Sequence, residues 1–137
     1  MKQILFALTI FVLPSCYNPS GNPQLASRPY PMELHIQESV PIQVIRQDEF
    51  VNIVNSTAED YNNATLWVNQ RYSKKIPALK AGATMRINLW NLHDSNGDQF
   101  NAGGVWRTDE PTQLVLAELQ TGEDQPLVGL IVIGKQE

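Results

Sequence analysis

Apolar and polar residues alternate along much of the chain after residue 33, with the period of two that is typical of β-strands. The clearest stretch is 85–89, which predicts a strand with one buried face and one wet face. Two later stretches, 114–119 and 127–133, are apolar at consecutive positions and predict strands covered on both faces. The alternating strands are expected at 34–36, 40–44, 50–55, 66–68 and 85–89, with a break at 38–39.

Turn signals separate these strands. Glycine and asparagine tolerate positive φ, so pairs that contain them favour turns between strands. The pairs are Asn62-Asn63, Ala81-Gly82, Asn96-Gly97, Gly103-Gly104 and Thr121-Gly122. About seven short strands at this spacing predict an all-β, antiparallel β-sandwich. Helix is expected only as a single turn at 58–61, where Thr57 and Asp60 have the spacing of a capping box.

The tryptophan in Leu66-Trp67-Val68 gives the predicted sandwich a resemblance to the immunoglobulin-like fold, which has a core tryptophan. The paired cysteines of a true immunoglobulin domain are absent, because the chain has one cysteine, Cys16, and therefore no internal disulfide. The resemblance concerns architecture and implies no function.

The first residues are typical of a secretory signal. Lys2 precedes an apolar run at 4–13, and a small residue, Ser15, follows it. The run is well short of the ~20 residues that span a bilayer, so an uncleaved anchor is the weaker alternative. Ordinary secretion with cleavage nearby is a second alternative.

The sequence Leu13-Pro14-Ser15-Cys16 resembles the end of a bacterial lipoprotein signal peptide. Leu13 matches the aliphatic position and Ser15 the small one, whereas Pro14 departs from the usual residues. The resemblance implies that residues 1–15 are removed and that Cys16 is acylated, with palmitate among the acyl groups. It also implies a membrane-anchored protein of the cell envelope. Tyr17 is not the Asp that marks inner-membrane retention in such proteins, which favours the outer membrane.

After the cysteine, residues 16–31 read as a Pro-rich tether ahead of a β-domain at 32–137. Proline, serine, glycine and asparagine are frequent in it, so it is expected to be extended or disordered and to act as a spacer. The prolines are Pro19, Pro23, Pro29 and Pro31.

The net charge of −4 argues against nucleic acid as a partner, because nucleic-acid binding needs a basic patch. The charge would also not draw the protein to an anionic membrane. No cofactor motif is present, and none is expected.

Asp94, Asn96 and Asp98 alternate like the first ligands of a calcium-binding loop. The resemblance stops there, because glycine comes two positions early, at Gly97, and Val105 stands where a glutamate is needed. Asn96-Gly97 is better explained as the tip of a hairpin, so these three residues are only weak metal candidates and no metal is expected.

His93 beside Asp94 could act as a ligand or a base, but no nucleophile is placed with it by any known motif. The other histidine, His35, is far away in sequence. Gly103-Gly104 lacks the Lys and Ser/Thr of a phosphate-binding loop and is expected to bend the chain into a strand. We therefore expect no enzyme, with no catalytic residues, and treat these as loop residues.

The tryptophans are the best candidates for a binding surface. If Leu66 and Val68 face the core, Trp67 shares the outer face with Asn69 and Arg71. By the same alternation, Trp90 shares a face with Arg86, and Trp106 follows the glycine pair. Aromatic and arginine side chains often anchor interfaces. The alternative is that each tryptophan packs beneath a loop or a neighbouring side chain.

Three hypotheses follow. The first is a non-enzymatic, lipid-anchored protein that binds or supports another envelope component, a protein or a glycan. The second is a small-ligand or carbohydrate-binding module that uses Trp67, Trp90 or Trp106. The third, a hydrolase or metal enzyme, would need His93, Asp94 and Asp98 to meet around one pocket.

Overall fold

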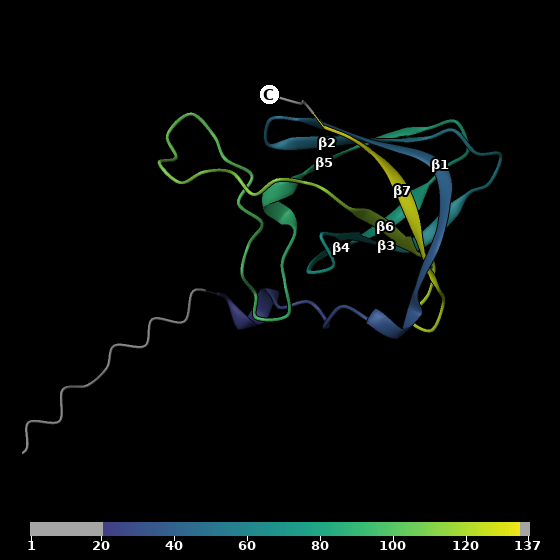
Figure 1. Cartoon of the computed structure of the whole chain (residues 1–137), viewed down its shortest axis with the longest axis horizontal. Helices are drawn as coiled ribbons and strands as arrows, with labels where there is room; N and C mark the ends of the chain where they lie inside the picture. The colour runs from purple at the N-terminus through teal and green to yellow at the C-terminus, as the bar shows by residue number, and fades with distance from the viewer. Residues whose placement is uncertain (1–20, 135–137) are drawn as a thin grey trace, which may run out of the picture.

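Seven strands form one mixed sheet that curls into a nearly closed barrel (Figure 1). The computed structural model describes residues 21–134. The strands are β1 (His35–Gln47), β2 (Phe50–Asn55), β3 (Tyr61–Val68), β4 (Tyr72–Leu79), β5 (Thr84–Asn88), β6 (Ala117–Gln120) and β7 (Leu127–Ile133). Three short 3₁₀ turns accompany them: η1 (Pro23–Leu25), η2 (Met32–Leu34) and η3 (Leu89–Asn91). Within residues 21–134, no helix has the length and apolar character needed to cross a bilayer.

The strand order is β4-β3-β6-β7-β1-β2-β5. All neighbouring pairs are antiparallel except β1 and β7, which run parallel. The order places β2 and β5 on one side of β1, and β7, β6, β3 and β4 on the other. The prediction of an all-β fold with seven strands is therefore confirmed. The structure differs in having one parallel pair and in joining the two groups of strands into one sheet through β1.

Strand β1 makes this junction possible because it is long and irregular. Its register against β7 shifts between His35 and Ser39 and again between Ser39 and Gln43. Gly129 of β7 lies opposite the first irregularity, where an added Cβ would come 3.3 Å from the carbonyl oxygen of Glu38. The predicted break at 38–39 is thus an irregularity within one strand, of the kind that bends a sheet.

The barrel closes at one point by a bridge outside the named strands. Ser73, at the start of β4, exchanges backbone hydrogen bonds with His93, which follows η3: Ser73 N donates to His93 O at 2.9 Å, and His93 N donates to Ser73 O at 3.3 Å. His93 also bridges Gln99 across the turn that contains Asn96-Gly97. The predicted hairpin tip is therefore present, and the residue that begins this hairpin, His93, closes the barrel.

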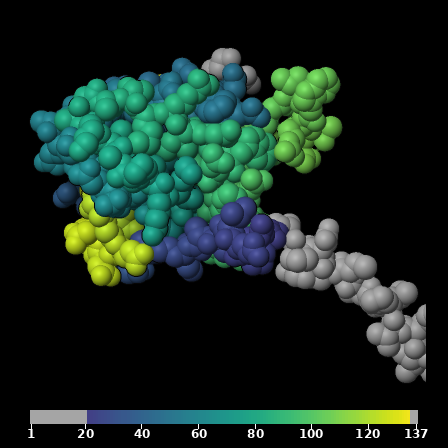
Figure 2. All heavy atoms as spheres, turned by 180° about the vertical axis from the view of Figure 1, so that it is seen from behind, coloured from purple at the N-terminus to yellow at the C-terminus, as the bar shows by residue number. Residues whose placement is uncertain are grey.

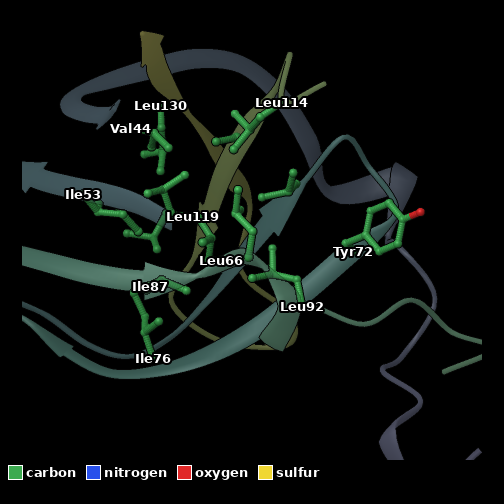
Figure 3. Close-up of a cluster of buried hydrophobic side chains, with 14 of the residues drawn as sticks. Val44, Ile53, Leu66, Tyr72, Ile76, Ile87, Leu92, Leu114, Leu119 and Leu130 are labelled. Carbon is green, nitrogen blue, oxygen red and sulfur yellow. The ribbon is translucent and has the colours of Figure 1, made fainter. Parts of the chain in front are cut away.

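Alternating residues of the strands point inward and form one apolar core (Figure 3). Val44, Ile53 and Ile87 reach it from β1, β2 and β5, and Leu66 and Leu119 reach it from β3 and β6. Four of these side chains have 0% exposure: Val44, Ile53, Leu66 and Leu119. This inward face is what the period-two pattern predicted.

The bounds of β2 and β7 agree with the predicted stretches, but other predictions need correction. Strand β4 was not predicted, because Lys74, Lys75 and Pro77 interrupt its apolar pattern. Only the last part of 114–119 is strand, and the pair Asn62-Asn63 lies inside β3, although Asn63 does have a positive φ of 50°.

The predicted helical turn at 58–61 is also wrong. Asn55 is buried, and its Oδ1 accepts hydrogen bonds from Thr57 N at 3.0 Å and Thr57 Oγ1 at 2.7 Å. Thr57 Oγ1 in turn accepts from Glu59 N at 3.1 Å. Asp60 accepts from Ala81 N at 2.8 Å instead of capping a helix. These side-chain bonds favour a turn over a helix because they compete for the same backbone donors.

Candidate functional site

The N-terminal segment 21–31, called the strap below, lies along the outside of the barrel (Figure 2). Asn22 N donates to Gly97 O at 3.1 Å, and Ser27 N donates to Asp94 O at 2.9 Å. The Ser27 hydroxyl also donates to His93 O at 3.0 Å. The tether predicted over 16–31 is therefore corrected for residues 21–31: they are bound to the domain, not extended away from it. Residues 16–20 lie outside the described part of the chain.

Trp67 lies on the outer face of β3, as the alternation predicted, but the strap covers it completely. Its exposure is 0%. The Tyr30 ring meets it edge-on with ring centroids 5.4 Å apart, and the Arg28 guanidinium carbon lies 5.6 Å from the indole centroid. Trp67 Nε1 donates to Gln120 Oε1 at 3.2 Å, and Arg28 also donates to that oxygen. Trp67 thus anchors the strap and is not available as a binding surface.

Beneath the strap lies a polar cluster that sequence reasoning missed. Glu118 of β6 is buried, at 1% exposure. Its Oε2 accepts from the Tyr30 hydroxyl at 2.8 Å, and its Oε1 lies 2.6 Å from His35 Nδ1. Burial, together with the hydrogen bond to Glu118, raises the pKa of Tyr30 above its ordinary value. The sequence contains one signal of this cluster: Glu118 is the only charged residue in the apolar stretch 114–119. A carboxylate that is buried there needs hydrogen-bond partners.

A second cluster holds the turn at 93–98. Arg71 donates from Nε and Nη2 to Asp94 Oδ2 at 2.9 and 2.7 Å. Asp94 Oδ1 accepts from the backbone N–H groups of Asn96 and Asp98 at 2.8 and 2.9 Å. Burial alone would raise the pKa of Asp94, but the hydrogen bonds from Arg71 and these amides outweigh it, and the pKa is lowered.

The weak metal candidates Asp94, Asn96 and Asp98 are used within the turn itself. Both carboxylate oxygens of Asp94 accept hydrogen bonds from the protein, and Asn96 contributes its backbone. Among residues 21–134, no three His, Cys, Asp or Glu side chains lie close enough together to hold a metal ion. The turn is a structural element that supports the strap.

The other predicted surface residues are separated from one another. Trp90 lies in η3 rather than on β5, so it does not continue the face of Arg86. Its Nε1 donates to Glu49 Oε1 at 3.1 Å. The guanidinium carbon of Arg107 lies over its ring, 4.4 Å from the centroid. The guanidinium carbon of Arg86 lies 4.1 Å from the centroid of the Phe50 ring. Each of these side chains therefore has its own partner within the domain.

Asn69 has a positive φ of 53° and holds the segment before β6. Its Nδ2 donates to Gln113 O at 2.7 Å, and its Oδ1 accepts from Val115 N and Leu116 N at 3.0 and 3.2 Å. Its role is structural.

Trp106 is the one predicted tryptophan that is open to solvent. It lies with Val105 near the tip of a loop at 101–113, called the projecting loop, which stands away from the barrel (Figure 2). Their exposures are 94% and 92%. Gly103 and Gly104 have φ values of 85° and 134° and turn the chain into this loop, not into the strand that was expected.

The base of the projecting loop is held by hydrogen bonds. Arg46 donates from Nη1 to Thr112 O at 2.6 Å and from Nη2 to Ala102 O at 3.2 Å. Asn101 Nδ2 donates to Glu110 O at 3.0 Å, and Thr112 N donates to Asn101 O at 2.9 Å. The loop therefore presents its apolar tip from a fixed base.

A shallow depression of about 520 Å³ lies on the outer surface of β3 and β4, and a smaller one of about 320 Å³ adjoins the strap. Thr65, Lys75 and Glu123 line both. Neither contains a tryptophan or a residue that was predicted as a site.

Comparisons with protein-family models, curated proteins and solved structures give no match to this chain. The class of the protein is therefore defined by its fold: a seven-stranded all-β domain with an N-terminal strap bound to its surface.

Proposed function

We propose that this protein is a lipid-anchored, non-enzymatic binding or structural module of the cell envelope. The signal-like residues 1–15 and Cys16 lie outside the described part of the chain, so the anchor rests on their sequence. The observation that supports the proposal most is the strap: the segment that follows the anchor site is bound to the barrel by hydrogen bonds and by Trp67. Attachment at Cys16 would therefore fix the position of the whole domain, which suits a protein that acts by being held in place.

The polar clusters also support a non-enzymatic role. The Glu118 carboxylate is bound by Tyr30 and His35, and the Asp94 carboxylate by Arg71 and backbone amides. Both groups are used to hold the strap and the turn beneath it. A hydrolase or metal enzyme would need His93, Asp94 and Asp98 to meet around one pocket, and none of the three lines either of the two depressions described above.

The anchor is tested by the Cys16→Ser variant in cells given labelled palmitate. We expect the parent to carry label and to sediment with membranes, and the variant to lose both. Ser15→Ala is the matched control, because it keeps a small residue before the cysteine and should leave labelling unchanged. If Cys16→Ser still sediments with lipid as the parent does, the proposal fails.

The carbohydrate-binding alternative now depends on Trp106, because Trp67 is buried and the indole of Trp90 is covered by Arg107. Its test is a titration of tryptophan fluorescence with sugars and cell-wall fragments. A change that Trp106→Ala abolishes would support this alternative, whereas an unchanged spectrum would remove it.

A further inference from the structure

We infer that the tip of the projecting loop, Val105-Trp106, is a second membrane contact that touches the lipid headgroup region beside the anchor. The inference rests on the proposed lipid anchor at Cys16. The first argument is exposure: two adjacent apolar side chains are 92% and 94% exposed at the tip of a loop whose base is fixed. An indole has an apolar body and a polar N–H, and tryptophan is enriched at membrane–water interfaces for that reason.

The second argument is reach. Gly21 is already seated on the barrel, because an added Cβ there would come 2.5 Å from Asn96 O and 2.9 Å from Asp98 Oδ1. Five peptide units connect Cys16 to Gly21, and a chain of that length spans at most about 18 Å. A free tether of fifteen or so residues would allow the domain to tumble far from the lipid, but a bound strap keeps this end of the barrel close to the bilayer.

The third argument is direction. The projecting loop and the beginning of the strap lie on the same side of the barrel, the loop at its upper corner and the strap at its lower corner, and the loop extends outward from that side (Figure 1). An anchor that leads directly into the strap therefore brings the loop toward the membrane. Tethering also raises the local concentration of lipid at the loop tip, so that a contact too weak to bind alone becomes populated.

The fourth argument is charge. The tip residues carry none, and the nearest charged residues in the loop are Arg107, Asp109 and Glu110. Arg107 lies over the Trp90 ring, and the chain as a whole is acidic, at −4. The contact is therefore interfacial and apolar, not an electrostatic attraction to anionic lipid. It should occur on phosphatidylcholine and depend little on salt.

The test uses residues 16–137 coupled through Cys16, the only cysteine, to a maleimide lipid in phosphatidylcholine vesicles with brominated acyl chains. The bromines should quench the part of the tryptophan emission that Trp106→Ala removes, and that part should shift to shorter wavelength. Val105→Asp should weaken the quenching. Val115→Asp is the matched control, because Val115 is also exposed, at 69%, but lies outside the loop, and its variant should be quenched like the parent.

A long Gly-Ser insertion between Ser20 and Gly21 tests the role of the bound strap, and it should reduce the quenching. Trp106 emission that stays unquenched and water-like would overturn the inference and leave the tip available to a protein partner. The result is separate from that of the Cys16→Ser experiment, because the maleimide lipid supplies the anchor whether or not cells acylate this cysteine.

Discussion

The hydroxyl of Tyr30 donates a hydrogen bond to Glu118 Oε2 at 2.8 Å, so a residue of the strap satisfies a carboxylate that is buried in β6. Removing this donor should affect the strap and the sheet together. We expect Tyr30→Phe to lower the free energy of unfolding by about 2 kcal/mol, because a buried charged acceptor loses one of its partners. Urea unfolding measures the loss, and hydrogen exchange should show that amides of the strap lose protection first. Unchanged protection of the strap would contradict its dependence on this bond.

The raised pKa of Tyr30 predicts a pH effect with a definite sign. Because the neutral hydroxyl is favoured in the folded state, its contribution to stability is complete below the ordinary tyrosine pKa of about 10 and is lost as the pH rises through the folded value. The stability of the parent should therefore fall more steeply above about pH 10 than that of Tyr30→Phe. Burial also raises the pKa of Tyr72, so the difference between parent and variant, not the parent alone, is the quantity to measure.

Gly97 and Gly82 provide a matched pair of substitutions. Both have positive φ, at 82° and 69°, so alanine should cost about 1 kcal/mol at either position. At Gly97 the new Cβ would also overlap the backbone carbonyl of Asn22, whereas at Gly82 nothing lies within 4 Å. We expect limited proteolysis to cut the strap of Gly97→Ala and to leave that of Gly82→Ala intact. Equal resistance in both variants would argue against the contact between Asn22 and Gly97.

The bond between Arg71 and Asp94 should stabilise the turn that supports the strap. We expect Asp94→Asn to lower stability by about 2 kcal/mol at neutral pH, because hydrogen bonds to a charged, buried oxygen are lost. Since the pKa of Asp94 is lowered, its contribution is present above the ordinary aspartate pKa and is lost as the pH falls through the folded value. The gap between parent and variant should therefore shrink below about pH 4.

Asp60 is the control for that experiment. Its pKa is also lowered, by Ala81 N and Lys80, but the pair it forms with Lys80 is exposed. Solvent screens such pairs, so Asp60→Asn should cost much less than Asp94→Asn when chemical denaturation is measured at neutral pH. If the two variants lose equal stability, the burial of Asp94 is not what makes its bond to Arg71 strong.

Truncation of Trp67 should lower the stability of the domain strongly, whereas truncation of Trp106 should hardly change it. Trp67→Ala should cost about 3–5 kcal/mol, because it empties the space beneath the strap. Trp106→Ala should change stability by less than about 0.5 kcal/mol, because its side chain packs against little. Thermal unfolding with calorimetry separates the two. A large loss from Trp106→Ala would show that the projecting loop packs against the barrel in solution.

The fold was predictable where apolar periodicity was regular. The alternation in β2 and the continuous apolar run in β7 extend from end to end, and the bounds of both strands were predicted correctly. The prediction that β7 is covered on both faces is wrong at its end, because Ile131 and Ile133 are exposed. Strand β4 was missed because Lys74, Lys75 and Pro77 interrupt its apolar pattern, as charged residues and proline often do in an edge strand, and local pattern reading treats such a stretch as loop. Similarly, the helical turn at 58–61 was predicted from Thr57 and Asp60, and the buried Asn55 that redirects Thr57 could not be anticipated without its tertiary contacts.

The strap shows a limit of composition as evidence. Prolines such as Pro23 and Pro29 correctly indicated a segment without ladder hydrogen bonds, but single bonds from Asn22 and Ser27 are enough to bind such a segment to a neighbouring surface. The outward position of Trp67 was predicted by alternation. Its burial depends on which segment crosses it, and no local pattern carries that information.

The parallel pairing of β1 with β7 has a consequence for how the polypeptide folds as it is made. The first strand finds its permanent neighbour in the last one, as His35 pairs with Leu127. Until that final stretch has left the ribosome, β1 and β6 each lack a neighbouring strand and the barrel cannot close. Contacts of such long sequence separation also form slowly. Loss of β7 alone would therefore leave β6 and β1 without the strand that joins them, and the domain could not be completed.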